Sequence, residues 1–136
     1  MRMTTLTAVL ATVLLAAPAH ADALKARQFW DKLHRYEAIA LNDYKSRNIS
    51  PIVLSRSQSI WSLQSDARLE DEFAACSSAA KSLAQMVSST YFDARRGQIP
   101  MDWYKLSPAY RVERSRCLEA IGLKEDSYPL PWWFGM

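Results

Sequence analysis

A long stretch of the chain, from Asp66 to Arg96, carries apolar residues at steps of three and four. Because an α-helix turns once every 3.6 residues, this spacing places them on one helical face. The positions that share the face are Leu69, Phe73, Cys76, Ala80, Leu83, Val87 and Tyr91. The middle of the stretch, residues 74–80, contains only Ala, Cys and Ser, so a second helix can approach its backbone closely. The spacing therefore predicts one long helix around which the other elements pack.

Three further segments carry helical signals. Apolar residues recur with the helical period over residues 22–48. The pair Ser50-Pro51 suits the cap and the first position of a helix over 51–64, and Ser107-Pro108 repeats it for a helix over 108–121. The connector over 97–106 is expected to be an aromatic loop. With Gly97 and Gly122 as left-handed caps, we predict an all-α bundle of about four helices.

The only two cysteines, Cys76 and Cys117, fall in two of these predicted helices. An even number of cysteines in an exported chain favours a disulfide. The small residues around Cys76 permit the close approach that a bridge between helices needs. We therefore predict a structural disulfide between Cys76 and Cys117.

The N-terminus has the pattern of a secretory signal peptide. Arg2 precedes an apolar run over residues 6–17, which Pro18 breaks, and Ala19-His20-Ala21 matches the small-x-small cleavage pattern. The run is shorter than the ~20 residues that span a bilayer. We expect cleavage after residue 21, a single mature domain over 22–136 with no transmembrane segment, and secretion, or a periplasmic location in a Gram-negative bacterium.

The charge balance excludes nucleic acid as a partner. The chain has 17 Lys and Arg against 14 Asp and Glu, and the two signs are interspersed. A nucleic-acid-binding domain needs a concentrated basic surface, which this pattern does not provide.

The C-terminal residues 127–136 contain two prolines and several aromatic residues. The prolines exclude a helix, so we expect an extended aromatic strip. Exposed aromatic side chains dominate many interfaces. The candidate contact residues are Trp103, Tyr104, Trp132, Trp133 and Phe134. The alternative is that the strip folds back and closes the open end of the bundle as part of the core.

No catalytic, metal-binding or cofactor-binding motif is present. His34 is the only histidine after residue 21, and it has no recognisable nucleophile near it in the sequence. A zinc site usually needs four ligands, and the Cys-x-x-Cys-His signature of covalent haem is absent. We therefore expect no cofactor and no metal.

The expected architecture is similar to that of periplasmic immunity and inhibitor proteins, which block cell-wall-degrading enzymes. The similarity concerns architecture and covers no motif, so no residue role follows from it. Our leading hypothesis is a small exported, non-enzymatic domain that binds another envelope or secreted protein. The alternatives are a small envelope hydrolase or lyase that uses His34 with a carboxylate, a carrier of a small ligand, and a purely structural protein. The oligomeric state does not follow from the sequence.

Overall fold

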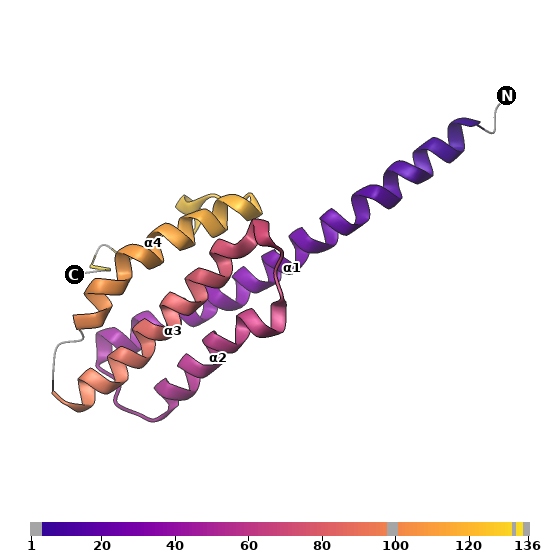
Figure 1. The fold of residues 1–136 in the computed structure, drawn as a ribbon. Coiled ribbons are helices and arrows are strands. Elements are labelled where there is room, and N and C mark those ends of the chain that lie inside the picture. Colours follow the sequence, from indigo (N-terminus) through magenta and orange to yellow (C-terminus); the bar gives the residue numbers. More distant parts are fainter. Residues whose placement is uncertain (1–3, 98–100, 132, 135–136) are drawn as a thin grey trace.

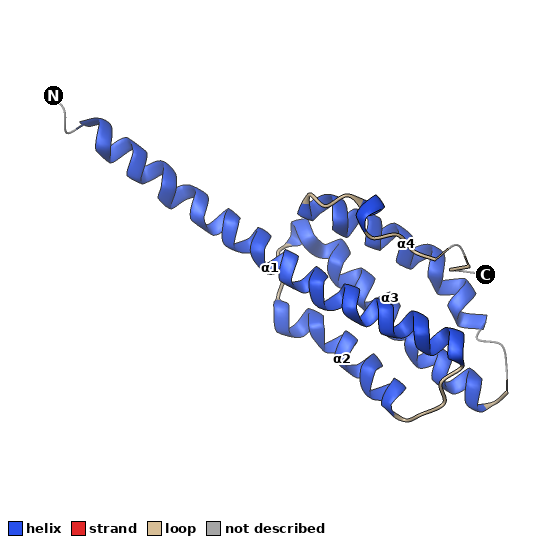
Figure 2. Cartoon of the chain, turned by 180° about the vertical axis from the view of Figure 1, so that it is seen from behind, coloured by secondary structure: helices blue, strands red, loops and turns tan. Residues whose placement is uncertain are grey.

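The chain forms an up-and-down bundle of helices (Figures 1 and 2). The computed structural model describes residues 4–97, 101–131 and 133–134, with side chains from residue 21 onward except those of residues 101, 102 and 104. The elements are α1 (Thr4–Ser46), α2 (Ile52–Ala67), η1 (Asp71–Phe73), α3 (Ala74–Arg95), α4 (Met101–Ile121) and η2 (Glu125–Ser127). The described residues contain no strand, which confirms the predicted all-α class. None of the described helices is long and apolar enough to cross a membrane.

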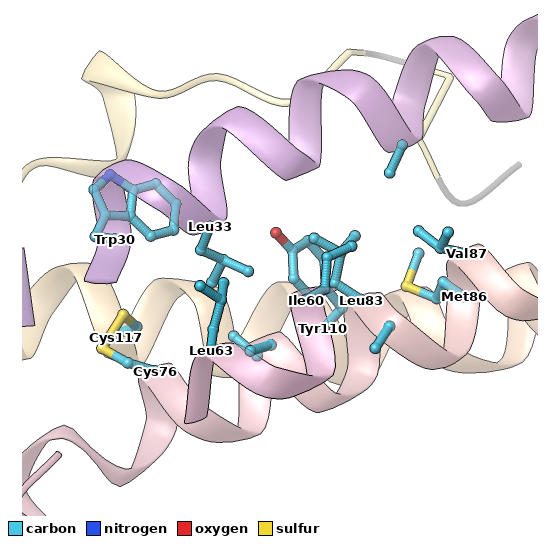
Figure 3. Close-up of a cluster of buried hydrophobic side chains, with 14 of the residues drawn as sticks. Trp30, Leu33, Ile60, Leu63, Cys76, Leu83, Met86, Val87, Tyr110 and Cys117 are labelled. Atoms are coloured by element: carbon cyan, nitrogen blue, oxygen red, sulfur yellow. A yellow bond between two sulfur atoms is a disulfide. The ribbon is translucent and has the colours of Figure 1, made fainter. Parts of the chain in front are cut away.

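Helix α3 lies at the centre of the bundle, between α2 and α4, as its apolar spacing predicts. Phe73, just before it, and the face from Cys76 to Tyr91 are buried. Leu33 from α1, Ile60 and Leu63 from α2 and Leu83 from α3 gather in this core (Figure 3). Tyr110 and Leu118 of α4 are also buried, so the core draws on side chains from α1, α2, α3 and α4.

The predicted disulfide is present. Cys76 of α3 and Cys117 of α4 are bonded, and their Cα atoms are 4.6 Å apart (Figure 3). Helix axes usually lie 8–10 Å apart, so this contact requires the small side chains that surround Cys76. Such a bridge is consistent with an oxidising, extracytoplasmic environment.

The first helix is longer than predicted. It was expected over 22–48, but α1 begins at Thr4 and continues through Pro18 to Ser46. An interior proline removes a helical hydrogen bond and its ring clashes with the preceding turn, so it disfavours helix, but the helix here persists on both sides of it. The N-terminal part of α1 projects away from the bundle (Figure 1). The first core residue of the described side chains is Ala26.

The boundary between the second and third helices was predicted wrongly. Instead of a restart at residue 66, α2 continues to Ala67, and the next residue, Arg68, caps it with φ 47°. The Arg68 amide donates to the Gln64 carbonyl, and α3 begins only after η1. A left-handed residue that is neither Gly nor Asn leaves no local signal of a helix end.

The expected loop before residue 108 is also corrected. Helix α4 begins at Met101, so Pro108 lies inside it. Pro108 is exposed, so its ring meets solvent, whereas Trp103 in the preceding turn is fully buried. Burial of this large side chain favours helix before the proline, and it outweighs the one hydrogen bond that is lost. Gly97 (φ 69°) and Gly122 (φ 86°) adopt the predicted left-handed conformation after α3 and α4.

The predicted aromatic strip follows η2 and returns along α4 (Figure 2). Phe134 is 3% exposed and lies beside Trp103, with ring centroids 5.8 Å apart. Tyr44 of α1 stacks on Trp103 at 4.2 Å and on the half-buried Trp133 at 5.9 Å. The described part of the strip thus joins α1 to the start of α4, in agreement with the core alternative.

Candidate functional site

A buried cluster of polar residues joins α1, α4 and the C-terminal strip. The carboxylate of Glu37 accepts two hydrogen bonds from Arg114, from Nε at 2.6 Å and from Nη2 at 2.9 Å. The Tyr110 hydroxyl donates a short hydrogen bond to the same carboxylate. Arg114 Nη2 also donates to the Tyr128 carbonyl at 2.6 Å. Glu37 and Arg114 are nearly inaccessible to solvent, so this bidentate ion pair lies in the interior.

Electrostatics in this cluster favour a protonated tyrosine and a charged arginine. Burial raises the pKa of Tyr110 well above its ordinary value, and the negative charge of Glu37 raises it further. Burial acts to lower the pKa of Arg114, but the hydrogen bonds and charge of Glu37 outweigh it and raise that pKa. Tyr110 therefore stays protonated and Arg114 stays charged near neutral pH.

The raised pKa of Tyr110 predicts a loss of stability in alkali. Above pH ~10 the unfolded chain loses the Tyr110 proton while the folded chain keeps it. The contribution of Tyr110 to the free energy of unfolding should then fall by about 1.4 kcal/mol for each unit by which the pH rises. Urea titrations at pH 9, 10 and 11 should show a shallower fall for Tyr110→Phe than for wild type. Tyr36→Phe, which changes a half-buried tyrosine outside the cluster, serves as the control. Equal slopes for all three proteins would contradict the prediction.

His34 lies at the edge of this cluster. Its ring stacks on Trp30 at 5.5 Å, and its Nδ1 is 3.5 Å from Glu37 Oε1. Among the described residues, Nδ1 has no hydrogen-bond partner. The neighbouring carboxylate is already occupied by Arg114 and Tyr110, so it is poorly placed to orient the imidazole as a general base.

The structure describes the side chains of three of the five predicted contact residues, and two of these three are buried. Trp103 is 0% exposed and Phe134 is 3% exposed, so neither offers surface to a partner in this conformation. Trp133 is half-buried against Tyr44. Trp132 and the side chain of Tyr104 lie outside the described residues.

An open groove of about 800 Å³ runs between α1 and α2. Helix α1 lines it with Lys32, Arg35, Tyr36 and Ile39. Helix α2 lines it with Ser55, Gln58, Ser59, Ser62, Leu63 and Asp66. Neither His34 nor Glu37 is among the residues that line it. The groove combines apolar side chains, hydroxyl groups and charge, which is the composition of a binding surface.

The serines of α2 explain why the groove exists. Ser55, Ser59 and Ser62 recur at steps of four and three, so they share one helical face. Two of their hydroxyls donate hydrogen bonds to backbone carbonyls of α2 itself. Ser59 donates to the Ser55 carbonyl at 3.0 Å, and Ser62 donates to the Gln58 carbonyl at 2.9 Å. These short side chains leave the space beside α1 unfilled. Considered one by one, these serines only lower the helix propensity of the α2 segment. Their spacing, however, could have indicated that they share one face of the helix.

No group of three or more His, Cys, Asp or Glu side chains that could hold a metal ion occurs among the described residues. Comparisons with protein-family models, with curated proteins and with solved structures find no match to this chain.

Proposed function

We propose that this protein is an exported, non-enzymatic domain that binds another protein through the groove between α1 and α2. The observation that carries the proposal is the groove itself, which leaves Ile39 of α1 39% exposed beside Tyr36 and Leu63. Apolar side chains gathered in an open groove favour contact with a second protein surface. The groove thus replaces the aromatic strip as the proposed contact.

The N-terminal pattern and the disulfide support export. The apolar run over residues 6–17 belongs to the part of α1 that projects from the bundle. Cleavage after Ala21 would remove none of the described core side chains, because the first of these is Ala26. The mature domain would then fold and form its disulfide in an oxidising compartment.

A crosslinking experiment in the producing cells tests the proposal. A photo-crosslinking amino acid is placed at Ile39, inside the groove, and in a separate variant at Val112, which is 49% exposed on α4. We expect a crosslinked protein from position 39 that is lost when Ser59→Trp fills the groove. The products from position 112 should not change with that substitution. Ser59 is exposed, so the larger side chain leaves the core intact, and thermal unfolding checks this.

Two results would contradict the proposal. One is the absence of any crosslink from position 39, and the other is a crosslink that persists in the Ser59→Trp background. The groove is also large enough for a small ligand, so the protein could instead be a carrier. Native mass spectrometry of the purified wild-type chain tests this alternative. A bound small molecule that disappears in Ser59→Trp would identify a carrier.

A further inference from the structure

The groove has more positive than negative charge along its α1 wall. Lys32 and Arg35 line the main groove, and Lys25 lines an adjoining hollow of about 190 Å³. The two hollows share Lys32, Leu63 and Asp66. Among the described residues, the only carboxylate in either lining is that of Asp66, on α2. The continuous surface therefore presents three basic side chains and one acidic side chain.

These basic side chains have no ion-pair partner among the described residues. Two acidic residues of α1 pair with other arginines, Asp31 with Arg27 at 3.4 Å and Asp43 with Arg56 of α2 at 2.5 Å. Arg35 donates only to the backbone carbonyl of Asp31, at 3.4 Å. Like charges three or four positions apart on one helix face repel each other, and an acidic partner removes that repulsion. The electrostatics thus select a negatively charged occupant.

The spacing of the lining residues favours a helix as that occupant. On α1 they recur at steps of three and four along one stripe, at Lys25, Gln28, Lys32, Arg35 and Ile39. On α2 the stripe is Ser55, Ser59, Ser62 and Asp66, which again follows steps of four and three. Two such stripes side by side form the surface into which a further helix packs, and the short serines allow it to approach closely. The distance from position 25 to position 39 is about 21 Å of helix, or roughly four turns.

We propose that the groove binds an acidic amphipathic helix of a partner protein. This inference rests on the proposed function and names the chemistry of the partner. The apolar face of the incoming helix contacts Tyr36, Ile39 and Leu63. Its Asp or Glu side chains lie along one flank and pair with Lys25, Lys32 and Arg35.

Defined peptides test this inference with the mature disulfide-bonded chain. The acidic probe is a fluorescent four-turn helix with Leu at steps of three and four and Glu along one flank. The second probe replaces every Glu by Gln, and the third replaces every Glu by Lys. At low ionic strength we expect the acidic probe to bind at least about tenfold more tightly than the Gln probe in fluorescence anisotropy. This advantage should be largely lost in 0.5 M salt, where charges are screened within about 4 Å.

Charge reversal gives the decisive comparison. The triple variant Lys25→Glu, Lys32→Glu and Arg35→Glu should prefer the Lys probe to the acidic probe. A matched variant reverses Lys81, Lys105 and Lys124, which are exposed and line neither hollow, and it should keep the wild-type preference. The inference is overturned if wild type binds none of the probes, if it binds the acidic and Gln probes equally, or if the triple reversal leaves the preference unchanged. Binding to anionic lipid vesicles without binding to any peptide would likewise overturn it.

The crosslinking experiment separates this inference from the proposed function. If the segment captured from position 39 is not acidic, the inference about charge fails while binding through the groove stands. If nothing is captured in the groove, the proposed function fails, whatever the peptides do.

Discussion

Replacement of Glu37 by Ala should lower the free energy of unfolding by about 3–5 kcal/mol. The substitution leaves the guanidinium of Arg114 buried without its carboxylate, since Arg114 is 0% exposed. It also removes the acceptor of the Tyr110 hydroxyl, which is buried as well. An uncompensated buried charge costs much more than the pair contributes, because the desolvation of Arg114 is no longer offset. Urea denaturation followed by far-UV circular dichroism measures the change.

A double variant separates the loss of the pair from the burial of a lone charge. Glu37→Leu combined with Arg114→Met replaces both charged groups by apolar groups of similar size. Its cost should be clearly smaller than that of Glu37→Ala, because no charge then remains in the interior. Some cost remains, since Arg114 also donates to the Tyr128 carbonyl and so holds the C-terminal strip. A loss below about 1 kcal/mol for Glu37→Ala would show that the cluster is open to water, and it would contradict the burial on which the prediction rests.

Removal of the disulfide should have a comparable effect. The bridge closes a loop with a sequence separation of 41 residues. By the chain-entropy relation, such a loop contributes about 4 kcal/mol through its restriction of the unfolded chain, which is an upper estimate. We expect the double variant Cys76→Ala and Cys117→Ala to lose about 2–4 kcal/mol of stability. Both sites are fully buried, but Ala is close in size to Cys and keeps the helices close together.

Reduction of the wild-type protein provides the control for the disulfide. A reducing agent should add 2 Da to the mass and lower the melting temperature by an amount similar to that of the double Ala variant. The double Ala variant itself should not respond to the reducing agent. An unchanged melting temperature of the wild type on full reduction would show that the bridge does not stabilise the fold.

Much of the fold could be predicted from short-range patterns. The apolar spacing around Leu83 located the central helix, and the small residues around Cys76 indicated where a second helix approaches. The two glycines that follow α3 and α4 marked where those helices end. These signals are local because helical periodicity and left-handed caps depend on residues within a few positions of each other.

The helix boundaries that failed were decided by tertiary contacts. Pro108 resembles a helix start, but burial of Trp103 extends α4 by more than a turn before it. Arg68 adopts a left-handed conformation without the residue type that usually signals it. In both places packing of the surrounding helices outweighs local preference.

The polar cluster was missed although its register is visible in the sequence. Glu37 stands in line with the buried Trp30, Leu33 and Ala40, at helical steps. A charged residue in such a position usually marks an edge of the buried face. Arg114 lies 77 positions away from its carboxylate partner, so only the meeting of α1 and α4 makes their burial possible.

The sequence by itself determined that the chain is helical, how its central helix faces the core, and which two cysteines pair. It determined these properties because each depends on residue spacing along one helix or on the only possible pairing of two thiols. The tertiary structure alone decided that Trp103 and Phe134 are core rather than contact surface. It also decided that the serine face of α2 stands beside the basic stripe of α1 with space between them. Whether a face is buried or open depends on the distance to its neighbour, which is set by all the helices packing together.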